Sequence, residues 1–374
     1  MITLSNIPGQ PTVKRILLNS LNRQKLASTY LFYGKDGLGK WPMAIAMAAL
    51  VNCEKPVKDA DGHIVDACGK CRNCRQIANL IFPELHFAIP IPPHKNTDET
   101  ITLSLEYLEQ KKKEPYRNVT STRQLTIPVD VAREIRQKTA IKPQAGLKRV
   151  ILFYQMEKML PASADSLLKL IEEPPPETII ILTANDPNNL LPTIPSRAQK
   201  ILFKPIPEKE ITEYISAQYG LEIEKAAFWA RLSMGSLGQA LSLIEGEEEI
   251  SLRQTSFLMF KSLFLKDIPS AVATINEFIN PNNRGETEYI LRQWQSFLSD
   301  IILLKYGGHI SEIINSDLGA EFENLLVRVS DPDSPCNLLM AIKGVTLSLR
   351  RNVHIRPAMT ALAFQFQKCI NQSS

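Results

Sequence analysis

Short apolar runs recur through the first 204 residues of the chain, and segments of mixed polarity separate them. Runs that are apolar at successive positions are typical of strands covered on both faces, as in a parallel sheet between two layers of helices. The five predicted strands are YLFY (30–33), LHFAIPI (85–91), VILFY (150–154), IIIL (179–182) and KILF (200–203). We therefore expect an α/β domain with a five-stranded parallel sheet.

Helical periodicity marks the segments between these runs. The helices predicted from it span residues 40–50, 72–81, 130–140 and 162–173. The last of them ends before Pro174, Pro175 and Pro176, because proline cannot continue a helix. Strands and helices together predict that residues 1–204 form a three-layer α/β domain.

The pattern changes after the fifth predicted strand. Pro205 and Pro207 mark a joint, and residues 205–249 carry short amphipathic helices that predict a small helical lid domain. Beyond the acidic run EGEEE (245–249), the chain keeps helical periodicity and lacks a convincing strand. We assign residues 250–374 to a third, all-helical domain.

Residues 92–126 do not fit the sheet, because they are polar and interrupted by prolines. We interpret this segment as an insertion or a flexible excursion, with one short helix. It contains three successive lysines at 111–113, which we interpret as a solvated face. The alternative interpretation of these lysines is a contact with DNA.

The composition narrows the class of protein. The 374-residue chain is 44% hydrophobic, and its 43 basic and 39 acidic residues leave a net charge of +4. That balance argues against a strongly cationic nucleic-acid-binding protein, so any contact with DNA must be local. The chain has no apolar run of about 18 residues and no basic-then-apolar start, so we expect no membrane span, no signal peptide and a cytoplasmic location.

The stretch YGKDGLGKWP (33–42) matches a phosphate-binding loop up to its last position. Gly34, Gly39 and Lys40 fit the pattern G-x-x-x-x-G-K-[ST], but Trp41 stands where a hydroxyl would hold Mg²⁺. The strand before the loop and the helix after it provide the context in which backbone N–H groups face a phosphate. We therefore expect weak nucleotide binding or none, and no Mg²⁺-dependent hydrolysis. The alternative is a glycine-rich turn without a ligand.

The end of the third predicted strand gives a second test of metal chemistry. ATPases with such loops place an Asp for the metal there, and usually a Glu that activates water, whereas this chain has Tyr154 and Gln155. Glu157 follows two residues later, and strand alternation makes it a poor substitute for either carboxylate. We interpret Glu157 as a carboxylate at a helix start.

Four of the six cysteines gather in one short segment. Cys53 is followed, after fourteen residues, by Cys68, Cys71 and Cys74 in two C-x₂-C steps. Four thiolates at this spacing can close a tetrahedral zinc site, and a site closed in this way is structural rather than catalytic. Reduced spare thiols or a redox pair are the alternatives. We expect His63, in the intervening loop, to face solvent.

Three stretches together resemble a known family, namely GKDGLGK (34–40) with CGKCRNC (68–74), SADSLLKLIEEPPPETIIILTAND (163–186) and LLPTIPSRAQKILF (190–203). They resemble the delta-prime subunits of the bacterial DNA polymerase III clamp loader, AAA+ relatives of the gamma and tau subunits. The resemblance covers about residues 7–245. It implies an AAA+ P-loop domain, a small helical lid domain and an all-helical C-terminal collar that serves oligomerisation.

The resemblance also implies roles for single residues. In this family an arginine of a Ser-Arg-Cys motif projects into the ATP site of a neighbouring subunit, and Arg197 of PSRAQ falls on that arginine. A guanidinium supplied in trans stabilises charge on the transferring phosphate. Ala198 replaces the cysteine, which we interpret as a packing change, and a plain surface arginine is the alternative for Arg197. In the lid, Gly235 and Ser236 match the family, but Gly238 stands where a sensor arginine is usual.

The function implied is that of a non-catalytic clamp-loader subunit of the DNA polymerase III holoenzyme, without ATPase activity of its own. Its implied partners are gamma or tau and delta subunits in a hetero-oligomer, the sliding clamp and primer-template DNA. Two alternatives stay open. One is an active ATPase subunit that uses Gln155 or Glu157, and the other is a zinc-dependent nucleic-acid-binding module that contacts DNA through Lys70, Arg72 and Arg75 beside the cysteines.

Overall fold

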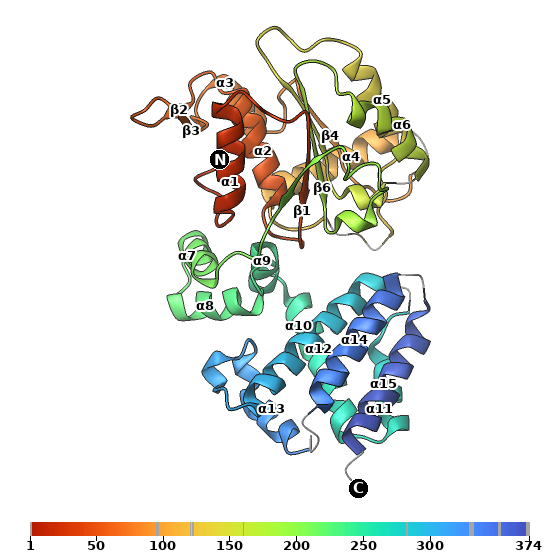
Figure 1. Cartoon of the computed structure of the whole chain (residues 1–374). Helices are drawn as coiled ribbons and strands as arrows, with labels where there is room; N and C mark the ends of the chain where they lie inside the picture. Colours follow the sequence, from red (N-terminus) through yellow and green to blue (C-terminus); the bar gives the residue numbers. More distant parts are fainter. Residues whose placement is uncertain are drawn as a thin grey trace. The chain divides into compact units, whose positions relative to one another are not determined.

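The computed structural model describes residues 2–94, 97–119, 121, 123–159, 161–281, 283–328, 333–350 and 353–371. The chain divides into two compact units, Met1–Ser242 and Leu243–Ser374 (Figure 1). Each unit packs a hydrophobic core of its own, as separate domains do.

The N-terminal unit is built on a five-stranded sheet in which all neighbouring strands are parallel. The strands lie in the order β4-β5-β6-β1-β7. They are β1 (Thr29–Tyr33), β4 (Leu85–Ala88), β5 (Arg149–Phe153), β6 (Thr178–Ala184) and β7 (Gln199–Leu202). The predicted parallel sheet is thus confirmed. Only the second strand, β4, is clearly shorter in the structure than its predicted range of 85–91. It ends before Pro90, which has no N–H to donate to a strand ladder.

Helices cover both faces of this sheet (Figure 1). They are α1 (Pro11–Asn22), α2 (Lys40–Val51), α3 (Arg72–Ala78), α4 (Thr97–Lys113), α5 (Val129–Thr139) and α6 (Pro161–Glu172), with 3-10 turns at Met156–Lys158 and Pro187–Asn189. Because strand side chains alternate, Tyr30 and Phe32 of β1 pack in the cluster that holds α1 and α2, whereas Leu31 packs in the cluster of α5 and α6. The result is a three-layer α/β arrangement.

The structure adds two elements that the sequence pattern does not predict. Helix α1 precedes the first strand, and its Val13 and Leu17 are buried against the sheet cluster. The antiparallel hairpin of β2 (Val57–Lys58) and β3 (Ile64–Asp66) occupies the loop between the first and second cysteines. Both are short or amphipathic elements whose burial depends on partners elsewhere in the chain.

The prediction for residues 92–126 is wrong in one respect. Helix α4 runs through 17 residues, so about half of the insertion is one regular helix that is longer than the short helix expected. Its Leu103, Tyr107 and Leu108 pack against the cluster of α1 and α2. These apolar positions recur at helical spacing, and the many polar residues between them conceal the pattern. Residues 95, 96, 120 and 122 of the insertion lie outside the described residues.

Three short helices follow β7 and form the predicted helical lid, α7 (Glu208–Tyr219), α8 (Ile223–Leu232) and α9 (Leu237–Glu245). The boundary between the two compact units falls inside α9. The lid is tied back to the start of the chain, because the backbone N–H of Gly9 donates to Glu210 Oε2 at 2.6 Å. It therefore belongs to the N-terminal unit and lies within reach of the stretch at residues 33–42 that resembles a phosphate-binding loop, called the phosphate-type loop below.

The C-terminal unit is helical throughout its described residues, as predicted. Its helices are α10 (Glu247–Leu265), α11 (Ile268–Phe278), α12 (Arg284–Lys305), α13 (Gly319–Leu326), α14 (Ser334–Arg350) and α15 (Ile355–Asn371), with 3-10 turns at Ile310–Glu312 and Ser316–Leu318. The Phe260 ring lies 5.4 Å from that of Phe297 and 5.9 Å from that of Phe366, both in edge-to-face geometry. Such aromatic contacts join α10, α12 and α15 into one core.

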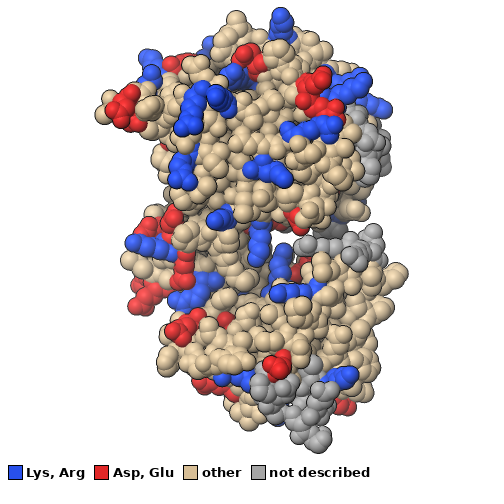
Figure 2. All heavy atoms as spheres, in the orientation of Figure 1, with Lys and Arg blue, Asp and Glu red and all other residues tan. Residues whose placement is uncertain are grey.

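The surface carries charges of both signs. On the face seen in Figure 2, basic and acidic side chains are interspersed and separated by wide uncharged areas. This distribution agrees with the net charge of +4. Within the described parts of the chain, no helix has both the length and the apolar composition that a membrane span needs.

Candidate functional sites

The phosphate-type loop joins β1 to α2 at the carboxyl end of the sheet. Gly34 has φ 141°, and a Cβ there would collide with the carbonyl oxygen of Phe203, the residue that follows the edge strand β7. Gly39, with φ 92°, is the N-cap of α2, so Lys40 is the first residue of the helix. The strand, loop and helix context expected of this motif is present. The residues that directly follow β5 and β6 lie at this same edge of the sheet, because the carboxyl ends of parallel strands lie side by side.

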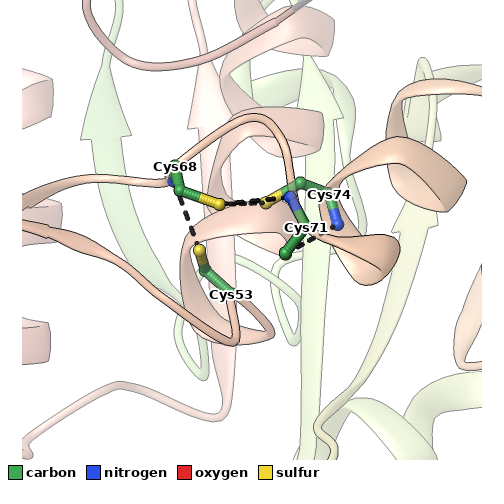
Figure 3. A group of neighbouring side chains, drawn as sticks. All are labelled: Cys53, Cys68, Cys71 and Cys74. Atoms are coloured by element: carbon green, nitrogen blue, oxygen red, sulfur yellow. Dashed lines mark hydrogen bonds between the residues drawn. The ribbon is translucent and has the colours of Figure 1, made fainter.

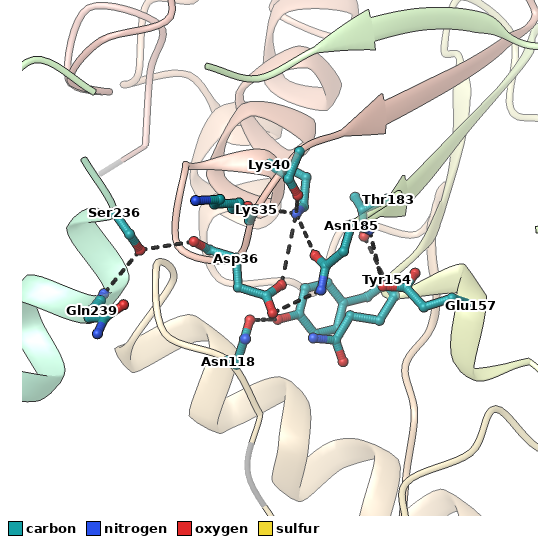
Figure 4. A network of polar contacts seen from close by, with 12 residues as sticks. Lys35, Asp36, Lys40, Asn118, Tyr154, Glu157, Thr183, Asn185, Ser236 and Gln239 are labelled. Atoms are coloured by element: carbon teal, nitrogen blue, oxygen red, sulfur yellow. Dashed lines mark hydrogen bonds and ion pairs between the residues drawn. The ribbon is translucent and has the colours of Figure 1, made fainter. Parts of the chain in front are cut away.

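The Lys40 side chain is directed at its own loop. Its ammonium donates to the carbonyl oxygens of Gly34 and Lys35 and to Asn185 Oδ1, the last two at 2.9 Å (Figure 4). It also lies 3.8 Å from Asp36 Oδ1, and Asn185 in turn donates to Asp36 Oδ2 at 2.9 Å. Only 5% of the residue is exposed, and this burial lowers the pKa of Lys40. Carbonyl, amide and carboxylate oxygens thus surround the ammonium on the protein side.

Aromatic rings occupy both positions where metal contacts were expected. Trp41 and Tyr154 are 2% and 4% exposed, and their ring centroids lie 5.4 Å apart at 84°. Trp41 also stacks on Phe87, with 5.5 Å between centroids. The Tyr154 hydroxyl donates to Asn118 Oδ1 at 2.9 Å (Figure 4). The Trp41 side chain has no oxygen, and the hydroxyl oxygen of Tyr154 is engaged with Asn118.

Lys111 is buried, so its interpretation as part of a solvated face is wrong. It is 2% exposed, and its ammonium lies 5.5 Å from the Trp41 ring centroid and 4.8 Å from that of Tyr154. The ammonium also donates to the carbonyl oxygen of Pro115 at 3.0 Å and to that of Arg117. Burial lowers the pKa of Lys111 to about 7. The Lys111 nitrogen therefore lies at cation–π distance from the two rings that stand in the metal positions, and it carries a full positive charge only below about pH 7.

The lid is packed directly on the loop. The backbone N–H of Gly238 donates to the carbonyl oxygen of Gly37 at 3.1 Å, and the Ser236 hydroxyl donates to that of Asp36 at 2.8 Å (Figure 4). A Cβ at Gly238 would collide with the Tyr116 carbonyl oxygen and lie 2.8 Å from the Gly37 Cα. No side chain longer than hydrogen fits there without a shift. The glycine in the expected sensor position is thus a packing requirement.

Glu157 lies at the carboxyl end of β5, in the first turn of a 3-10 helix, as interpreted from the sequence. Its Oε1 accepts the backbone N–H of Asn185 at 3.1 Å, while its Oε2 is buried without a partner among the described residues. Burial raises the pKa of the Glu157 carboxyl group. Gln155 donates its backbone N–H to Thr183 Oγ1 at 2.9 Å, which joins the ends of β5 and β6.

The four clustered cysteines meet in space. The Sγ atoms of Cys53, Cys68, Cys71 and Cys74 all lie within 4.8 Å of one another (Figure 3). Zinc–thiolate bonds of about 2.3 Å in a tetrahedron place sulfur atoms at comparable separations, so the donor set fits zinc. His63 is exposed and lies near Asp59, away from the thiols, in agreement with its predicted position.

Backbone N–H groups point at these sulfur atoms. Cys68 Sγ accepts from the N–H groups of Lys70 at 3.4 Å and Cys71 at 3.3 Å, and these bonds lower the pKa of Cys68 to about 6. The N–H of Cys68 points at Cys53 Sγ at 3.2 Å, and that of Cys74 at Cys71 Sγ at 3.4 Å. These bonds favour the thiolate form of Cys68, which is the form that binds metal, whereas burial raises the pKa of Cys53 and Cys74.

Arg197 lies at the other end of the sheet from the phosphate-type loop. Strand β7 pairs in parallel with β1, with Gln199 opposite Tyr30 and Leu202 opposite Tyr33. The loop follows Tyr33, whereas Arg197 precedes Gln199, so the length of the strand, about 10 Å, separates them. The Arg197 side chain is 41% exposed. It therefore cannot serve the loop of its own chain.

A family model described as DNA polymerase III, delta subunit, matches residues 9–207, more than half of the 374-residue chain. The chain belongs to this family. DNA polymerase III subunit delta' of Bacillus subtilis (strain 168) is 24% identical over 377 residues, with 96% of each chain covered. The delta' subunit of Escherichia coli (strain K12) is 26% identical over 217 residues, which cover 58% of this chain and 54% of the relative. The predicted resemblance to delta-prime subunits is confirmed.

The chain is also similar to gamma and tau subunits of DNA polymerase III. DNA polymerase III subunit tau of Bacillus subtilis (strain 168) is 25% identical over 322 residues, covering 80% of this chain and 50% of the relative. The chain thus spans about half the length of this tau subunit. Among solved structures, a gamma-subunit-related protein of DNA polymerase III from Thermotoga maritima is matched at 15% identity and a TM-score of 0.37, with 96% and 99% of the two chains covered.

The structure brings some predicted residues together and separates others. Lys40, Trp41 and Tyr154 meet at one edge of the sheet, while the cysteines and Arg197 form separate places. Sequence reasoning missed the role of Lys111. The signal was available, because position 111 lies four residues after Tyr107 and three after Leu108, and therefore on the apolar face of α4.

Proposed function

We propose that this chain is a non-catalytic subunit of the DNA polymerase III clamp loader. It presents Arg197 to the ATP site of a neighbouring gamma or tau subunit and helps to load the sliding clamp onto primer-template DNA. Residues 250–374 join it to the hetero-oligomer, which also contains the delta subunit. Family membership and the position of Arg197 support this proposal.

The observation that carries the proposal is the place of Arg197 in the fold. It is exposed at the amino end of the edge strand β7, about 10 Å of strand away from the phosphate-type loop of its own chain. An arginine that acts on a phosphate from this position must act on a phosphate bound by another chain. In other nucleotide hydrolases a guanidinium supplied in this way accelerates phosphoryl transfer by about 10³ to 10⁵.

The chain's own loop supports a non-catalytic role. Phosphoryl transfer needs a metal ion to neutralise the developing charge, and Trp41 and Tyr154 leave no metal ligand in the two expected positions. The Lys111 side chain packs against these two rings and fills the space beside them. Gly238 packed on Gly37 keeps the lid against the loop. We infer that the loop is a structural element that binds nucleotide weakly or not at all.

The cysteine site supports a structural metal. Four thiol groups close the coordination shell of a tetrahedral ion, so a zinc ion bound there has no position left for water or substrate. The ion would fix the hairpin β2–β3, whose Val57 and Val65 are exposed, and the start of α3. We assign zinc to Cys53, Cys68, Cys71 and Cys74 as a structural ion.

The test is reconstitution of the clamp loader with gamma or tau and delta subunits of the same bacterium. DNA- and clamp-stimulated ATP hydrolysis is compared for the wild type, Arg197→Ala and the control Arg133→Ala, an exposed arginine that also pairs with an acid, Asp130, at 3.4 Å. We expect hydrolysis to fall severalfold with Arg197→Ala and to stay unchanged with Arg133→Ala. Unchanged hydrolysis with Arg197→Ala in a fully assembled complex would overturn the proposal.

A second candidate function, an active ATPase subunit, rests on Glu157. Its buried Oε2 has no partner among the described residues and lies at the strand end where a catalytic carboxylate is usual. The isolated chain distinguishes the two functions. Magnesium-dependent ATP turnover that disappears with Lys40→Ala and Glu157→Gln would favour the active ATPase, and no turnover above that of these variants favours the non-catalytic subunit.

A further inference from the structure

A carboxylate lies beside the proposed trans arginine. Arg197 Nε is 3.1 Å from Glu172 Oε1, and Arg197 Nη1 donates to the carbonyl oxygen of Thr193 at 3.0 Å. The two contacts hold the guanidinium from two directions. Among the residues that the structure describes, no acceptor lies within hydrogen-bonding distance of Arg197 Nη2.

The two segments that carry this pair share one core. Glu172 is the last residue of α6, directly after the buried Ile171, and Arg197 stands between the buried Ile194 and the partly buried Ala198. Ile171, Ile194 and Ala198 all pack in the cluster of α5 and α6. Their packing fixes the backbones of both partners, so that only the side chains themselves are free to move.

The surroundings favour a cation at this place. A helix end carries a partial negative charge, and Glu172 adds a full one at the last residue of α6. The prolines at 174–176 end helix α6, so its last residue, Glu172, lies beside Arg197. Glu173, the next residue, is exposed and forms no ion pair among the described residues.

We propose that Glu172 is the positioning residue of Arg197. It restricts the long, exposed arginine side chain to the rotamer in which Nη2 and the second Nη1 proton face away from the protein, where a phosphate of the neighbouring subunit can accept them. Glu172 itself touches neither substrate nor the reacting atoms. This inference rests on the proposed function of Arg197, because it states how that arginine is made ready.

The experiment uses the reconstituted clamp loader and measures kcat and KM for DNA- and clamp-stimulated ATP hydrolysis. The single variants are Glu172→Gln, the neighbouring control Glu173→Gln and Arg197→Ala. A double variant combines Glu172→Gln with Arg197→Ala. We expect Glu172→Gln to lower kcat about threefold with KM for ATP unchanged, in line with an exposed ion pair, and Glu173→Gln to have no effect. In the Arg197→Ala background, Glu172→Gln should have no further effect.

The outcomes separate this inference from the proposed function. If Arg197→Ala lowers hydrolysis but Glu172→Gln does not, the trans arginine stands and its positioning by Glu172 is overturned. An equal loss with Glu172→Gln in the presence and absence of Arg197 would mean a structural effect and would also overturn it, as would an increase in kcat. If Arg197→Ala has no effect, both ideas fail. Equal assembly of every variant is checked by size-exclusion chromatography.

Discussion

The Lys111 ammonium lies 4.8 Å from the centre of the Tyr154 ring, and the same ammonium lies 5.5 Å from the centre of the Trp41 ring. Three sequence positions far apart thus form one buried group at the edge of the sheet where ATPases with such loops hold a metal ion. Aromatic faces attract cations, and the attraction strengthens when water is excluded. The group therefore connects α4 of the insertion to the start of α2 and the end of β5.

Lys111→Met should remove one contribution to the change of the free energy of unfolding with pH. Burial holds the pKa of Lys111 at about 7 in the folded chain, below its ordinary 10.5, so between these values the unfolded chain binds a proton that the folded chain has released. The free energy of unfolding therefore rises with pH through this range, by at most about 1.4 kcal/mol per pH unit for one group. We expect the wild type to gain stability relative to Lys111→Met between pH 7 and pH 9 in denaturant titrations.

Lys112→Met is the matched control, because Lys112 is the next residue of α4 and its side chain is 33% exposed. The difference between wild type and Lys112→Met should stay constant over the same pH range. A difference between wild type and Lys111→Met that also stays constant would contradict the assignment of a lowered pKa to Lys111.

Gly238→Ala should destabilise the N-terminal unit. A Cβ at position 238 would meet the backbone of Tyr116 and of Gly37, neither of which can turn away as a side chain could. Such overpacking typically costs about 1–3 kcal/mol. Gly344→Ala is the opposite case, because a Cβ at this position of α14 meets no atom within 4 Å and alanine favours a helix by up to about 1 kcal/mol.

Thermal unfolding followed by calorimetry checks this pair, since each substitution lies in a different compact unit. The transition of the N-terminal unit should move down with Gly238→Ala, and that of the C-terminal unit should stay or move up with Gly344→Ala. A Gly238→Ala chain as stable as the wild type would mean that the lid is not packed on the loop.

The sheet could be predicted from sequence because its signal is local. The inner strands β1, β5 and β6 are largely apolar runs that are buried on both faces, whereas the edge strand β7 is mostly exposed. The proximity of the cysteines could be predicted for the same reason, since the short spacing of Cys68, Cys71 and Cys74 keeps three thiols close together at the start of α3. These features need no knowledge of distant partners.

Helical spacing places Lys111 on the apolar face of α4, beside Tyr107 and Leu108, but it does not show what covers the ammonium. A lysine in a run of three is solvated unless a particular partner covers it, and the partners here, Trp41 and Tyr154, lie on other elements. The same holds for Glu172, whose neighbour Arg197 comes from a loop beyond β6. Contacts between distant segments depend on packing that no short pattern encodes.

Zinc content tests the cysteine site. The purified chain should contain about one zinc ion per molecule by atomic emission, as expected of a closed four-thiolate site. Cys71→Ser should lose the ion, and its thermal transition should move down because metal binding is coupled to local folding. Cys336→Ser, an exposed cysteine of the C-terminal unit, should keep both the ion and the transition. A metal-free wild type with unchanged stability under chelation would contradict the assignment.

Restoring the missing metal ligands should not restore ATP hydrolysis to the isolated chain. Trp41→Thr with Tyr154→Asp returns a hydroxyl and a carboxylate to the expected positions, but it also removes two rings that are nearly fully buried. Truncating one such ring typically costs about 3–5 kcal/mol. The Lys111 ammonium would then face the new carboxylate and compete with a metal ion for it.

The decisive comparison adds Lys111→Met to this double variant, with ATP turnover by the isolated chain measured in Mg²⁺ and in chelator. No turnover in the double variant and weak turnover in the triple variant would place Lys111 as the obstacle to metal binding. No turnover in either variant would leave the block with features that neither variant changes, namely Gln155 in place of a water-activating Glu and the lid packed on Gly37 through Gly238. Magnesium-dependent turnover already in the double variant would contradict the internal cation, because the charge of Lys111 would then leave room for a metal ion.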